Sequence, residues 1–437
     1  MTPSDPMPKT LTEWLAYIER QHPQAIEMGL ERVREVAVRI GLGRPAARVI
    51  TVAGTNGKGS TVAFIEAIAR EAGLRVGAYT SPHLLGYGER VRIAGDQASE
   101  DALVDAFAAV EAARGDTALT YFEFGTLAAL WLFERAALDL AVLEVGLGGR
   151  LDATNLVDAD VAVITTVDLD HQDWLGEDRE AIGTEKAAIA RAWKPLVLGD
   201  DDPPASVLRH AYAIGASAVR IGCDFFFEPL DDARWRWREV GFAIELPAPV
   251  LAAPVQLRNA AVAIAALRAL DIEVPDAAIE RGVAAARLSG RLQPFDRGGI
   301  AVSVDVGHNP QAARELAAWL RAHPAAGRTH AVYAALADKD VVAVVAAFDG
   351  LVDAWWLAGS LGAGTRGMGV EALAARLQGS VVHAARQLPD PGAALAAALQ
   401  AAVPGDRILV FGSFHAAEEA LHLLRGPGSE AGAQRSV

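Results

Sequence analysis

Cysteine is almost absent from this sequence: Cys223 is the only one in 437 residues. A single cysteine excludes an intramolecular disulfide and a metal site built only of cysteines, and it fits a reducing compartment. Positive charge is also scarce, with 40 lysines and arginines against 55 aspartates and glutamates and a formal net charge of −15. This balance argues against non-specific binding to nucleic acids or anionic membranes.

Long apolar runs are missing as well. None reaches the length of a membrane span, and the first residues lack the basic segment and apolar stretch of a secretory signal. We therefore expect a soluble, cytoplasmic protein with no nucleic-acid and no membrane partner. Hydrophobic residues still make up 52% of the chain, which is enough for a large core, and the length predicts two or three domains.

A glycine-rich loop follows a predicted strand at residues 49–52 and precedes a helical pattern. The loop consists of Gly54, Thr55, Asn56, Gly57, Lys58, Gly59 and Ser60. Glycines let backbone N–H groups close on phosphate oxygens, the helix start adds partial positive charge, and Lys58 supplies a point charge. The loop predicts a nucleoside triphosphate ligand, because its strand and helix context disfavours a loop without one. An ordinary P-loop hydrolase or kinase has serine or threonine directly after the lysine, so Gly59 speaks against that class.

Short apolar runs alternate with helical patterns along the chain. They occur at residues 76–80, 140–145 and 161–167, and again at 300–306, 331–336, 354–357, 381–384 and 408–411. This alternation predicts an α/β fold with ligands at the carboxyl ends of parallel strands. We expect a parallel-sheet ATPase domain over residues 1–293 and a smaller Rossmann-like α/β domain over residues 297–425.

Three further segments have a character of their own. Between about residues 200 and 256, apolar and polar residues alternate, which predicts a small antiparallel subdomain within the first domain. Residues 293–299 are interpreted as a connector between the domains. Residues 426–437 are rich in glycine, serine and charge and predict a disordered tail.

Several polar residues stand at the predicted strand ends, where a triphosphate and its divalent cation would lie. Ser60, Ser81, Glu144 and His171 are candidate metal ligands, because hard cations prefer oxygen with an occasional imidazole. Glu144 is the strongest, since a carboxylate inside an apolar strand is costly unless it is paired or bound to a metal. From the sequence alone Lys186 is most simply a solvated helix lysine. Residues 146–149 do not complete a dinucleotide motif, so no nicotinamide cofactor is expected.

Taken in order, these motifs resemble the bifunctional dihydrofolate synthase/folylpolyglutamate synthases, the folate branch of the Mur ligase superfamily. The resemblance covers nearly the whole chain. It rests on residues 26–33, the loop at 54–60, residues 81–92, 121–126, 144–155 and 170–186, Gly290 with Arg291, and residues 305–310 and 412–415. Two departures, Ser289 where proline is usual and Gly307 where alanine is usual, affect positions that need no functional side chain.

The resemblance implies roles for particular residues. Ser81, Glu144 and His171 would hold magnesium ions, two in number, and Lys186 would be carbamylated to N6-carboxylysine, with Lys58, Lys186 and His171 as the catalytic set. Asn259, Arg291 and Asp305 would contact ATP, whereas the role of His308 stays open. The pterin substrate would be held by Ile26, Glu27, Met28 and Gly29, by Phe122, Glu123, Phe124 and Gly125, and by Leu151, Asp152 and Ala153.

The implied activity is the ATP-dependent addition of L-glutamate to dihydropteroate and to tetrahydrofolate or folylpolyglutamates through an acyl phosphate, by a monomer. Arg90, Arg92 and Arg150 are candidates for meeting these anionic substrates, and Arg150 and Asp152 could instead clamp their loop. A folylpolyglutamate synthase without the first activity stays open. A muramyl amino-acid ligase is disfavoured because only 53 residues precede Gly54. A nucleotide-binding protein without catalysis is disfavoured because Lys58, Glu144, His171 and Lys186 are all present.

Overall fold

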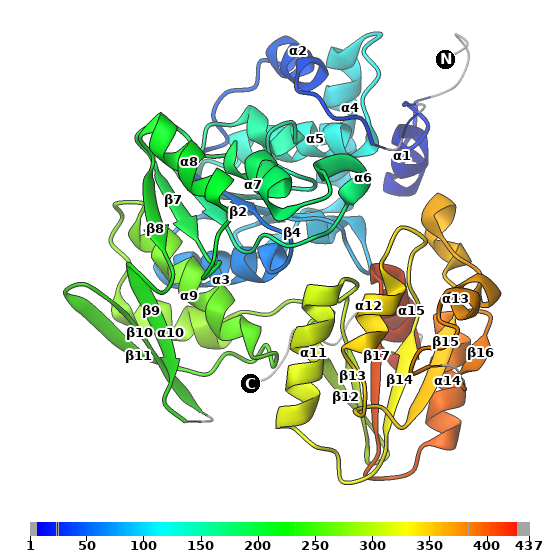
Figure 1. Cartoon of the computed structure of the whole chain (residues 1–437). Coiled ribbons are helices and arrows are strands. Elements are labelled where there is room, and N and C mark those ends of the chain that lie inside the picture. Colours follow the sequence, from blue (N-terminus) through cyan, green and yellow to red (C-terminus); the bar gives the residue numbers. More distant parts are fainter. Residues whose placement is uncertain (1–6, 23, 25, 232, 383, 426–437) are drawn as a thin grey trace. The chain divides into compact units, whose positions relative to one another are not determined.

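The computed structural model describes residues 7–22, 24, 26–231, 233–382 and 384–425, so the tail expected at 426–437 lies outside the described residues. The chain forms two units, one made of residues up to Val250 together with Gln256–Arg287, the other of Leu251–Val255 and the residues from Leu288 onward (Figure 1). No helix in the described ranges is both long and apolar enough to cross a membrane.

The first unit is built on an eight-stranded sheet of order β4-β3-β2-β5-β1-β6-β7-β8. Its strands are β1 (Ala46–Ala53), β2 (Val76–Tyr79), β3 (Val91–Ile93), β4 (Asp96–Gln97), β5 (Leu138–Glu144), β6 (Val161–Ile164), β7 (Pro195–Leu198) and β8 (Ser217–Arg220). The six strands from β2 to β8 in this order are parallel, whereas β3 and β4 add an antiparallel edge that the sequence did not reveal. Strands of only two or three residues are too short for an apolar pattern to be recognised.

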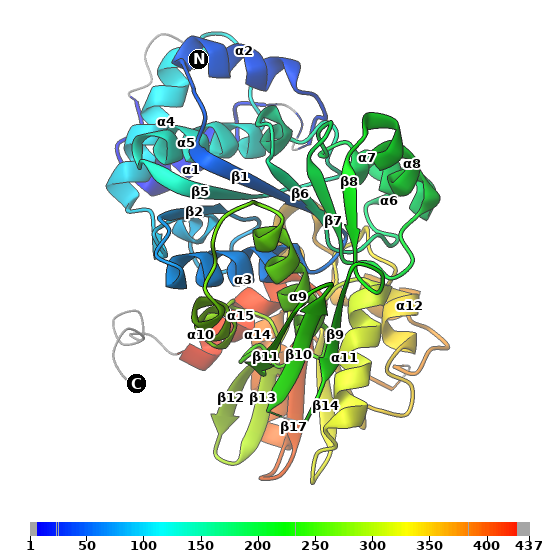
Figure 2. The ribbon, with the colours of Figure 1, turned by 90° about the vertical axis from the view of Figure 1, so that its left-hand side faces the viewer.

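Helices cover this sheet on both faces, as Figure 2 shows for α4 and α5 on one side and α3, α9 and α10 on the other. The helices of the unit are α1 (Leu11–Ile18), α2 (Glu31–Ile40), α3 (Lys58–Glu71), η1 (Tyr87–Arg90), α4 (Glu100–Arg114), α5 (Tyr121–Arg135), η2 (Ala153–Leu156), α6 (Gln172–Leu175), α7 (Arg179–Ala187), α8 (Ala205–Ile214), α9 (Val255–Arg268) and α10 (Asp276–Ala285). The helical crossovers are what allow neighbouring strands to run parallel.

The antiparallel part of this unit is narrower than the range 200–256 expected from the sequence. A three-stranded sheet of order β11-β10-β9 is formed by β9 (Phe225–Pro229), β10 (Arg234–Glu239) and β11 (Phe242–Pro247). Residues 205–220 instead form α8 and β8, which extend the parallel sheet. Trp235 and Trp237 on β10 are buried, so the alternation read from the sequence correctly marks one buried face.

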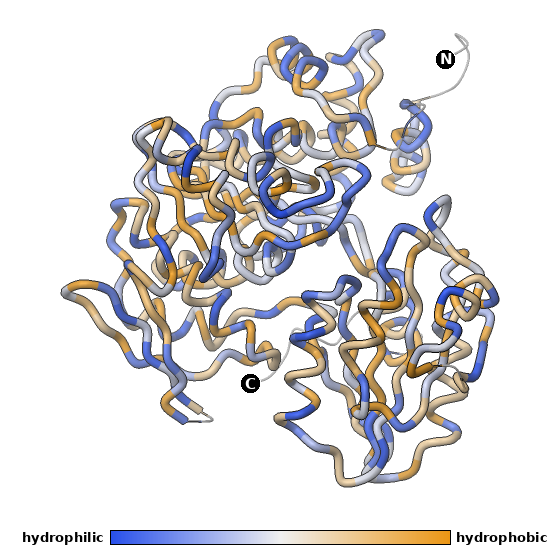
Figure 3. Tube along the Cα trace, viewed as in Figure 1, coloured by the Kyte–Doolittle hydropathy of each residue, from blue (hydrophilic) through white to orange (hydrophobic). Residues whose placement is uncertain are grey.

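The second unit has a six-stranded sheet of order β12-β13-β17-β14-β15-β16. Its elements are β12 (Gln293–Arg297), β13 (Ile300–Val304), α11 (Pro310–Ala322), β14 (Thr329–Tyr333), α12 (Val341–Ala346), β15 (Ala354–Ala358), η3 (Leu361–Arg366), α13 (Val370–Arg376), β16 (Arg386–Leu388), α14 (Pro391–Ala401), β17 (Arg407–Phe411) and α15 (Phe414–Arg425). Alternate strand residues such as Tyr333, Trp355 and Phe411 pack with α11, α12 and α13. Compared with Figure 1, Figure 3 shows hydrophobic residues along the central strands β13, β17 and β14 of this unit.

Two expectations about this unit are wrong. Residues 293–297 are not a connector but the edge strand β12, which pairs antiparallel with β13 through a turn at Gly298 and Gly299, both with positive φ. The last edge strand is β16, not residues 381–384; residue 383 lies outside the described ranges. An edge strand has one neighbour and no need for a continuous apolar run, so its sequence signal is weak.

Candidate functional site

The glycine-rich loop leaves β1 and opens α3 in a shape that requires glycine. Gly54 has φ 151°, and a Cβ there would lie 1.8 Å from Thr165 Oγ1. Gly57 has φ 85°, and a Cβ there would lie 2.6 Å from Asn259 Oδ1. No side chain caps the N-terminus of α3, which leaves its N–H groups directed into the loop. The backbone therefore forms a cradle for a phosphate, and Asn259, an expected nucleotide contact, lies against it.

Hydrogen bonds anchor this loop to the segment after β6. The N–H of Thr55 donates to the Thr166 carbonyl (2.8 Å), and that of Asn56 donates to Thr166 Oγ1 (3.1 Å). Thr165 Oγ1 donates to the Asn56 carbonyl (2.5 Å). Lys58 begins α3 and its Nζ donates to the carbonyl of Gly54 (2.9 Å). Thr165 and Thr166 were not expected in the site, although two hydroxyl residues directly after a buried strand were a readable signal.

The expected metal ligands come from neighbouring strand ends. Glu144 closes β5 and is paired in register with Val52 of β1, so it lies beside the start of the loop. The N–H of Ser81, just after β2, donates to Glu144 Oε2 (3.2 Å). Ser60 is in the first turn of α3, and His171, with φ 53°, stands at the N-terminus of α6 after β6. The structure thus brings Ser81 and Glu144 together.

The donor chemistry of these positions suits a hard cation that also binds phosphate. Within the described ranges no group of three or more histidine, cysteine, aspartate or glutamate side chains is arranged to hold a metal ion. One carboxylate, one imidazole and two hydroxyls leave coordination positions for phosphate oxygens and water, as Mg²⁺ prefers. The residues present therefore fit Mg²⁺ bound together with a triphosphate.

Lys186 is not the solvated lysine that the sequence alone favoured. It lies in α7 with only 4% of its surface exposed. Burial, together with the charge of Lys58, lowers the pKa of its amine from 10.5 to about 7, although the charges of Asp170 and Asp152 oppose the shift. The turn at Gly149 packs so closely on α7 that a Cβ there would lie 3.2 Å from Lys186 Cα. About half of the amines with this pKa are neutral near pH 7, and the neutral amine is the form that reacts with CO₂.

Asp152 acts as the clamp of its loop. Its Oδ2 accepts the N–H groups of Gly146 and Leu147, each at 2.9 Å, and its Oδ1 accepts the N–H (3.0 Å) and hydroxyl (2.6 Å) of Thr154. Burial raises the pKa of this carboxyl, although these hydrogen bonds oppose the shift. Arg150 is paired with Glu185 through Nη2 at 2.9 Å. The side chains of Asp152 and Arg150 therefore both stabilise the turn at residues 146–149, and this role of Asp152 is compatible with a further contact to substrate.

The three expected substrate segments meet at this edge of the unit. Glu27 and Glu123 are joined by Arg32, which bonds to Glu27 and places Nη2 2.9 Å from Glu123 Oε1. Phe122 lies against the turn, since a Cβ on Gly146 would be 2.6 Å from its Cζ. Met28, which precedes α2 together with Ile26 and Gly29, places its Cε 3.6 Å from a Cβ built on Gly148. Phe124 and Gly125 lie in α5, and Leu151 and Ala153 flank Asp152.

Not all of these side chains can reach a ligand. Phe124 has no exposed surface and packs with Trp14 and Phe107, at ring-centroid distances of 6.5 and 5.9 Å. Ala153 is likewise part of the core. Arg32, by contrast, was not expected in the site, although it lies in the 26–33 motif. Its link between two substrate segments depends on a contact across 91 residues of sequence, which no local pattern reveals.

The remaining expected residues belong to the second unit. Asp305 follows β13, and its carboxylate accepts the N–H groups of Leu292 (2.8 Å) and Gly307 (2.7 Å). Burial raises its pKa, and the nearby Arg291 opposes this. The Arg291 guanidinium lies 5.7 Å from the ring centroid of Phe414. His308 Nδ1 bonds to the carbonyl of Val306 (3.0 Å). These side chains form one cluster around the carboxyl end of β13.

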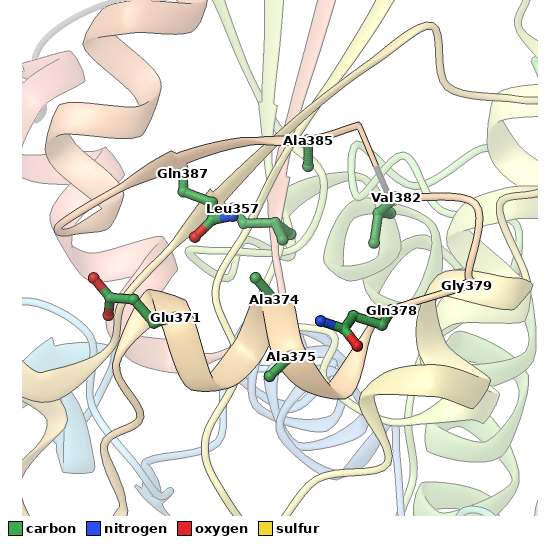
Figure 4. A pocket seen from close by; sticks show the side chains of 9 residues that line it. All are labelled: Leu357, Glu371, Ala374, Ala375, Gln378, Gly379, Val382, Ala385 and Gln387. Carbon is green, nitrogen blue, oxygen red and sulfur yellow. The ribbon is translucent and has the colours of Figure 1, made fainter.

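The same unit has a groove of about 330 Å³ between α13 and the edge of its sheet (Figure 4). It is lined by Leu357, Glu371, Ala374, Ala375, Gln378, Gly379, Val382, Ala385 and Gln387. None of these residues was expected to bind a ligand, and the groove contains no member of the Asp305 cluster.

The first unit combines a phosphate cradle, oxygen ligands for a hard cation at adjacent strand ends, and a buried lysine. A separate α/β unit follows it. This combination defines an ATP-dependent ligase of the Mur type. Family models agree: residues 52–266 match the Mur ligase middle domain and residues 290–414 match the Mur ligase glutamate ligase domain. The chain belongs to the dihydrofolate synthase/folylpolyglutamate synthase family. It is 45% identical over 416 residues to the Escherichia coli dihydrofolate synthase/folylpolyglutamate synthase, covering 95% of each chain.

Solved structures show the same relationship. Escherichia coli FolC in complex with DHPP and ADP has a TM-score of 0.89 and 45% identity, covering 94% of this chain and 97% of that one. The Yersinia pestis bifunctional enzyme complexed with AMPPNP and Mn has a TM-score of 0.88 and 45% identity, covering 96% and 99%. A third structure, of a bifunctional enzyme with Mn, AMPPNP and L-glutamate bound, has a TM-score of 0.87 and 45% identity, covering 94% and 97%.

Proposed function

We propose that this chain carries out both reactions of its family. It adds L-glutamate to dihydropteroate, giving dihydrofolate, and to tetrahydrofolate or folylpolyglutamates, with ATP as the energy source. The observation that carries this proposal is that the segments at 26–29, 122–125 and 151–153 gather around the turn after β5. The last residue of β5, Glu144, is paired in register with β1, the strand that leads into the phosphate cradle. Relatives with 45% identity bind ADP with DHPP, and AMPPNP with Mn and L-glutamate, in structures of the same fold.

The reaction needs an activated carboxyl group. The substrate carboxylate attacks the γ-phosphorus of ATP, which forms the acyl phosphate and releases ADP. The amine of L-glutamate then attacks the acyl carbon, so that the amide bond forms and inorganic phosphate leaves. The α3 N–H groups and Lys58 stabilise the charge that develops on the transferred phosphoryl group. Asn259, Arg291 and Asp305 are assigned as nucleotide contacts in this proposal, as the family resemblance implies.

Two Mg²⁺ ions in this proposal would be held by Ser60, Ser81, Glu144 and His171. When bound, they would neutralise charge during phosphoryl transfer. Lys186, once carbamylated, becomes a carboxylate beside the same strand ends. This conversion removes the repulsion between Lys186 and Lys58 and gives the buried position an anionic group. With Cys223 as its one cysteine the chain needs no oxidising compartment, and we place it in the cytoplasm as a monomer.

Glutamate-dependent ADP release by the purified protein tests the proposal. Dihydropteroate and tetrahydrofolate are offered separately, with Mg²⁺ and bicarbonate present. Release with both supports the two activities, whereas release with tetrahydrofolate alone reduces the function to a folylpolyglutamate synthase. Release with neither refutes the assignment. Lys58→Met should abolish turnover, and Lys194→Met, which removes a half-exposed lysine paired with Asp160, is the matched control.

A further inference from the structure

Of the three arginines expected to meet the anionic substrate, one has no acidic partner in the part of the chain that the structure describes. Arg92 is bound by Glu66, with Nη2 2.8 Å from Oε2, and Arg150 is bound by Glu185. Arg90 makes no ion pair with any residue in the described part of the chain. Its Nε donates a hydrogen bond to His83 Nδ1 (2.8 Å). Two of the three cations are therefore used within the protein, and Arg90 keeps its charge unneutralised.

An unpaired charge at this depth is unusual. Arg90 is 9% exposed, and burying an ionised side chain is costly unless it is compensated. The partial compensation comes from aromatic rings: the guanidinium carbon lies 5.4 Å from the ring centroids of both Tyr87 and Tyr121. Burial raises the pKa of both tyrosines, so their hydroxyls stay neutral and do not cancel the charge. Neither Nη1 nor Nη2 makes a hydrogen bond to another described residue, and together they form the planar fork that suits a carboxylate.

Arg90 lies between the expected metal and substrate positions. Its carbonyl accepts the N–H of Thr80 (2.9 Å), the residue before Ser81. Tyr121 is the first residue of α5 and directly precedes Phe122. The buried Tyr87 hydroxyl has no hydrogen-bond partner within the described residues, and it is 2.4 Å from a Cβ built on Gly125. The arginine thus adjoins both the place where a carboxylate is activated and the substrate segment at 122–125.

We propose that Arg90 is a carboxylate-binding residue that recognises a glutamyl α-carboxylate, held ready by Tyr87, Tyr121 and His83. This inference rests on the proposed function. In a folate substrate the γ-carboxyl group reacts, whereas the α-carboxylate of the same glutamyl group keeps its charge only a few bonds away. Dihydropteroate has no such group, since its one carboxylate is the reacting one. Because the rings and His83 fix the guanidinium, little conformational entropy is lost on binding.

Steady-state kinetics of Arg90→Met tests the proposal, with Arg34→Met, which removes an exposed arginine on α2, as the matched control. A charged hydrogen-bond pair predicts a rise in KM of about 10- to 100-fold for tetrahydrofolate. The KM for dihydropteroate should change less than about twofold, and Arg34→Met should change neither. If the carboxylate bound is that of the incoming L-glutamate, the KM for L-glutamate rises instead, with both acceptors.

The proposal is overturned if Arg90→Met leaves all three KM values unchanged, or if it lowers kcat equally with both acceptors at constant KM. Should the methionine variant not fold, Arg90→Lys decides: it keeps the charge but loses the fork, and a rise in KM for tetrahydrofolate of about three- to tenfold is expected. Wild-type ADP release with both acceptors is measured first. Its absence refutes the proposed function, whereas its presence with unaltered Arg90 variants refutes only this inference.

Discussion

Withdrawing bicarbonate should inactivate the enzyme through one buried amine, that of Lys186. At pH 7 about half of the Lys186 amines are neutral, given the lowered pKa of about 7, against roughly one in three thousand for a lysine with the ordinary pKa of 10.5. Since CO₂ adds only to a neutral amine, carbamate formation at Lys186 is favoured roughly a thousandfold over an exposed lysine at the same pH. Lys194, which is half-exposed, serves as the internal control.

Isotope-labelled bicarbonate makes the carbamate visible by NMR, and ADP release is measured in parallel. We expect one carbamate resonance in the wild type, none in Lys186→Met, and a loss of turnover of at least about a hundredfold in that variant or in bicarbonate-free buffer. Adding bicarbonate should restore the wild type but not the variant. Full activity of Lys186→Met, or a wild-type rate and spectrum that ignore bicarbonate, would refute the reasoning.

The unmodified amine also predicts a dependence of stability on pH. The folded-state pKa lies below the unfolded value, so between about pH 7 and 10.5 the unfolded chain binds more protons than the folded protein. The free energy of unfolding therefore rises with pH across that window in bicarbonate-free buffer, by up to about 5 kcal/mol, and this gain is absent below it. Urea unfolding of the wild type and of Lys186→Met measures the difference, which should disappear in the variant.

Three further predictions concern other contacts. Gly57→Ala should raise the KM for ATP at least about tenfold, because its Cβ would meet Asn259 and its φ is positive; an unchanged KM would contradict the cradle. Arg32→Met should raise the KM for both pterin substrates about tenfold by separating the two segments that it joins, with ATP binding unaffected as the control. Asp406→Asn should destabilise the second unit by about 1–3 kcal/mol, since its carboxylate accepts two N–H groups and lies 3.3 Å from His330; unaltered urea unfolding would contradict this.

Strand ends in the middle of the sheet were predictable from the sequence. The segments that became β1, β2, β5 and β6 are central strands whose apolar runs are continuous, so their carboxyl ends, and Glu144 with them, could be placed at one edge. At α1, Thr10 and Glu13 form a capping box, a pattern local enough to be recognised in a sequence. The edge strands β4, β12 and β16 were missed or misplaced because one-sided pairing imposes no continuous apolar pattern. The strand β3, which lies next to the edge, was missed because it has only three residues.

The sequence by itself determined the phosphate cradle, the α/β class and the family resemblance, because these depend on residue types at short spacings along the chain. Only the tertiary structure decided which charges are neutralised. Arg92 meets Glu66 across 26 residues, and Lys186 is buried beside Lys58 from a different part of the sequence. Burial and pairing arise between segments that local spacing does not relate. For that reason three arginines that look equivalent in the sequence differ in the structure. Arg92 and Arg150 form ion pairs, whereas Arg90 has no acidic partner among the described residues.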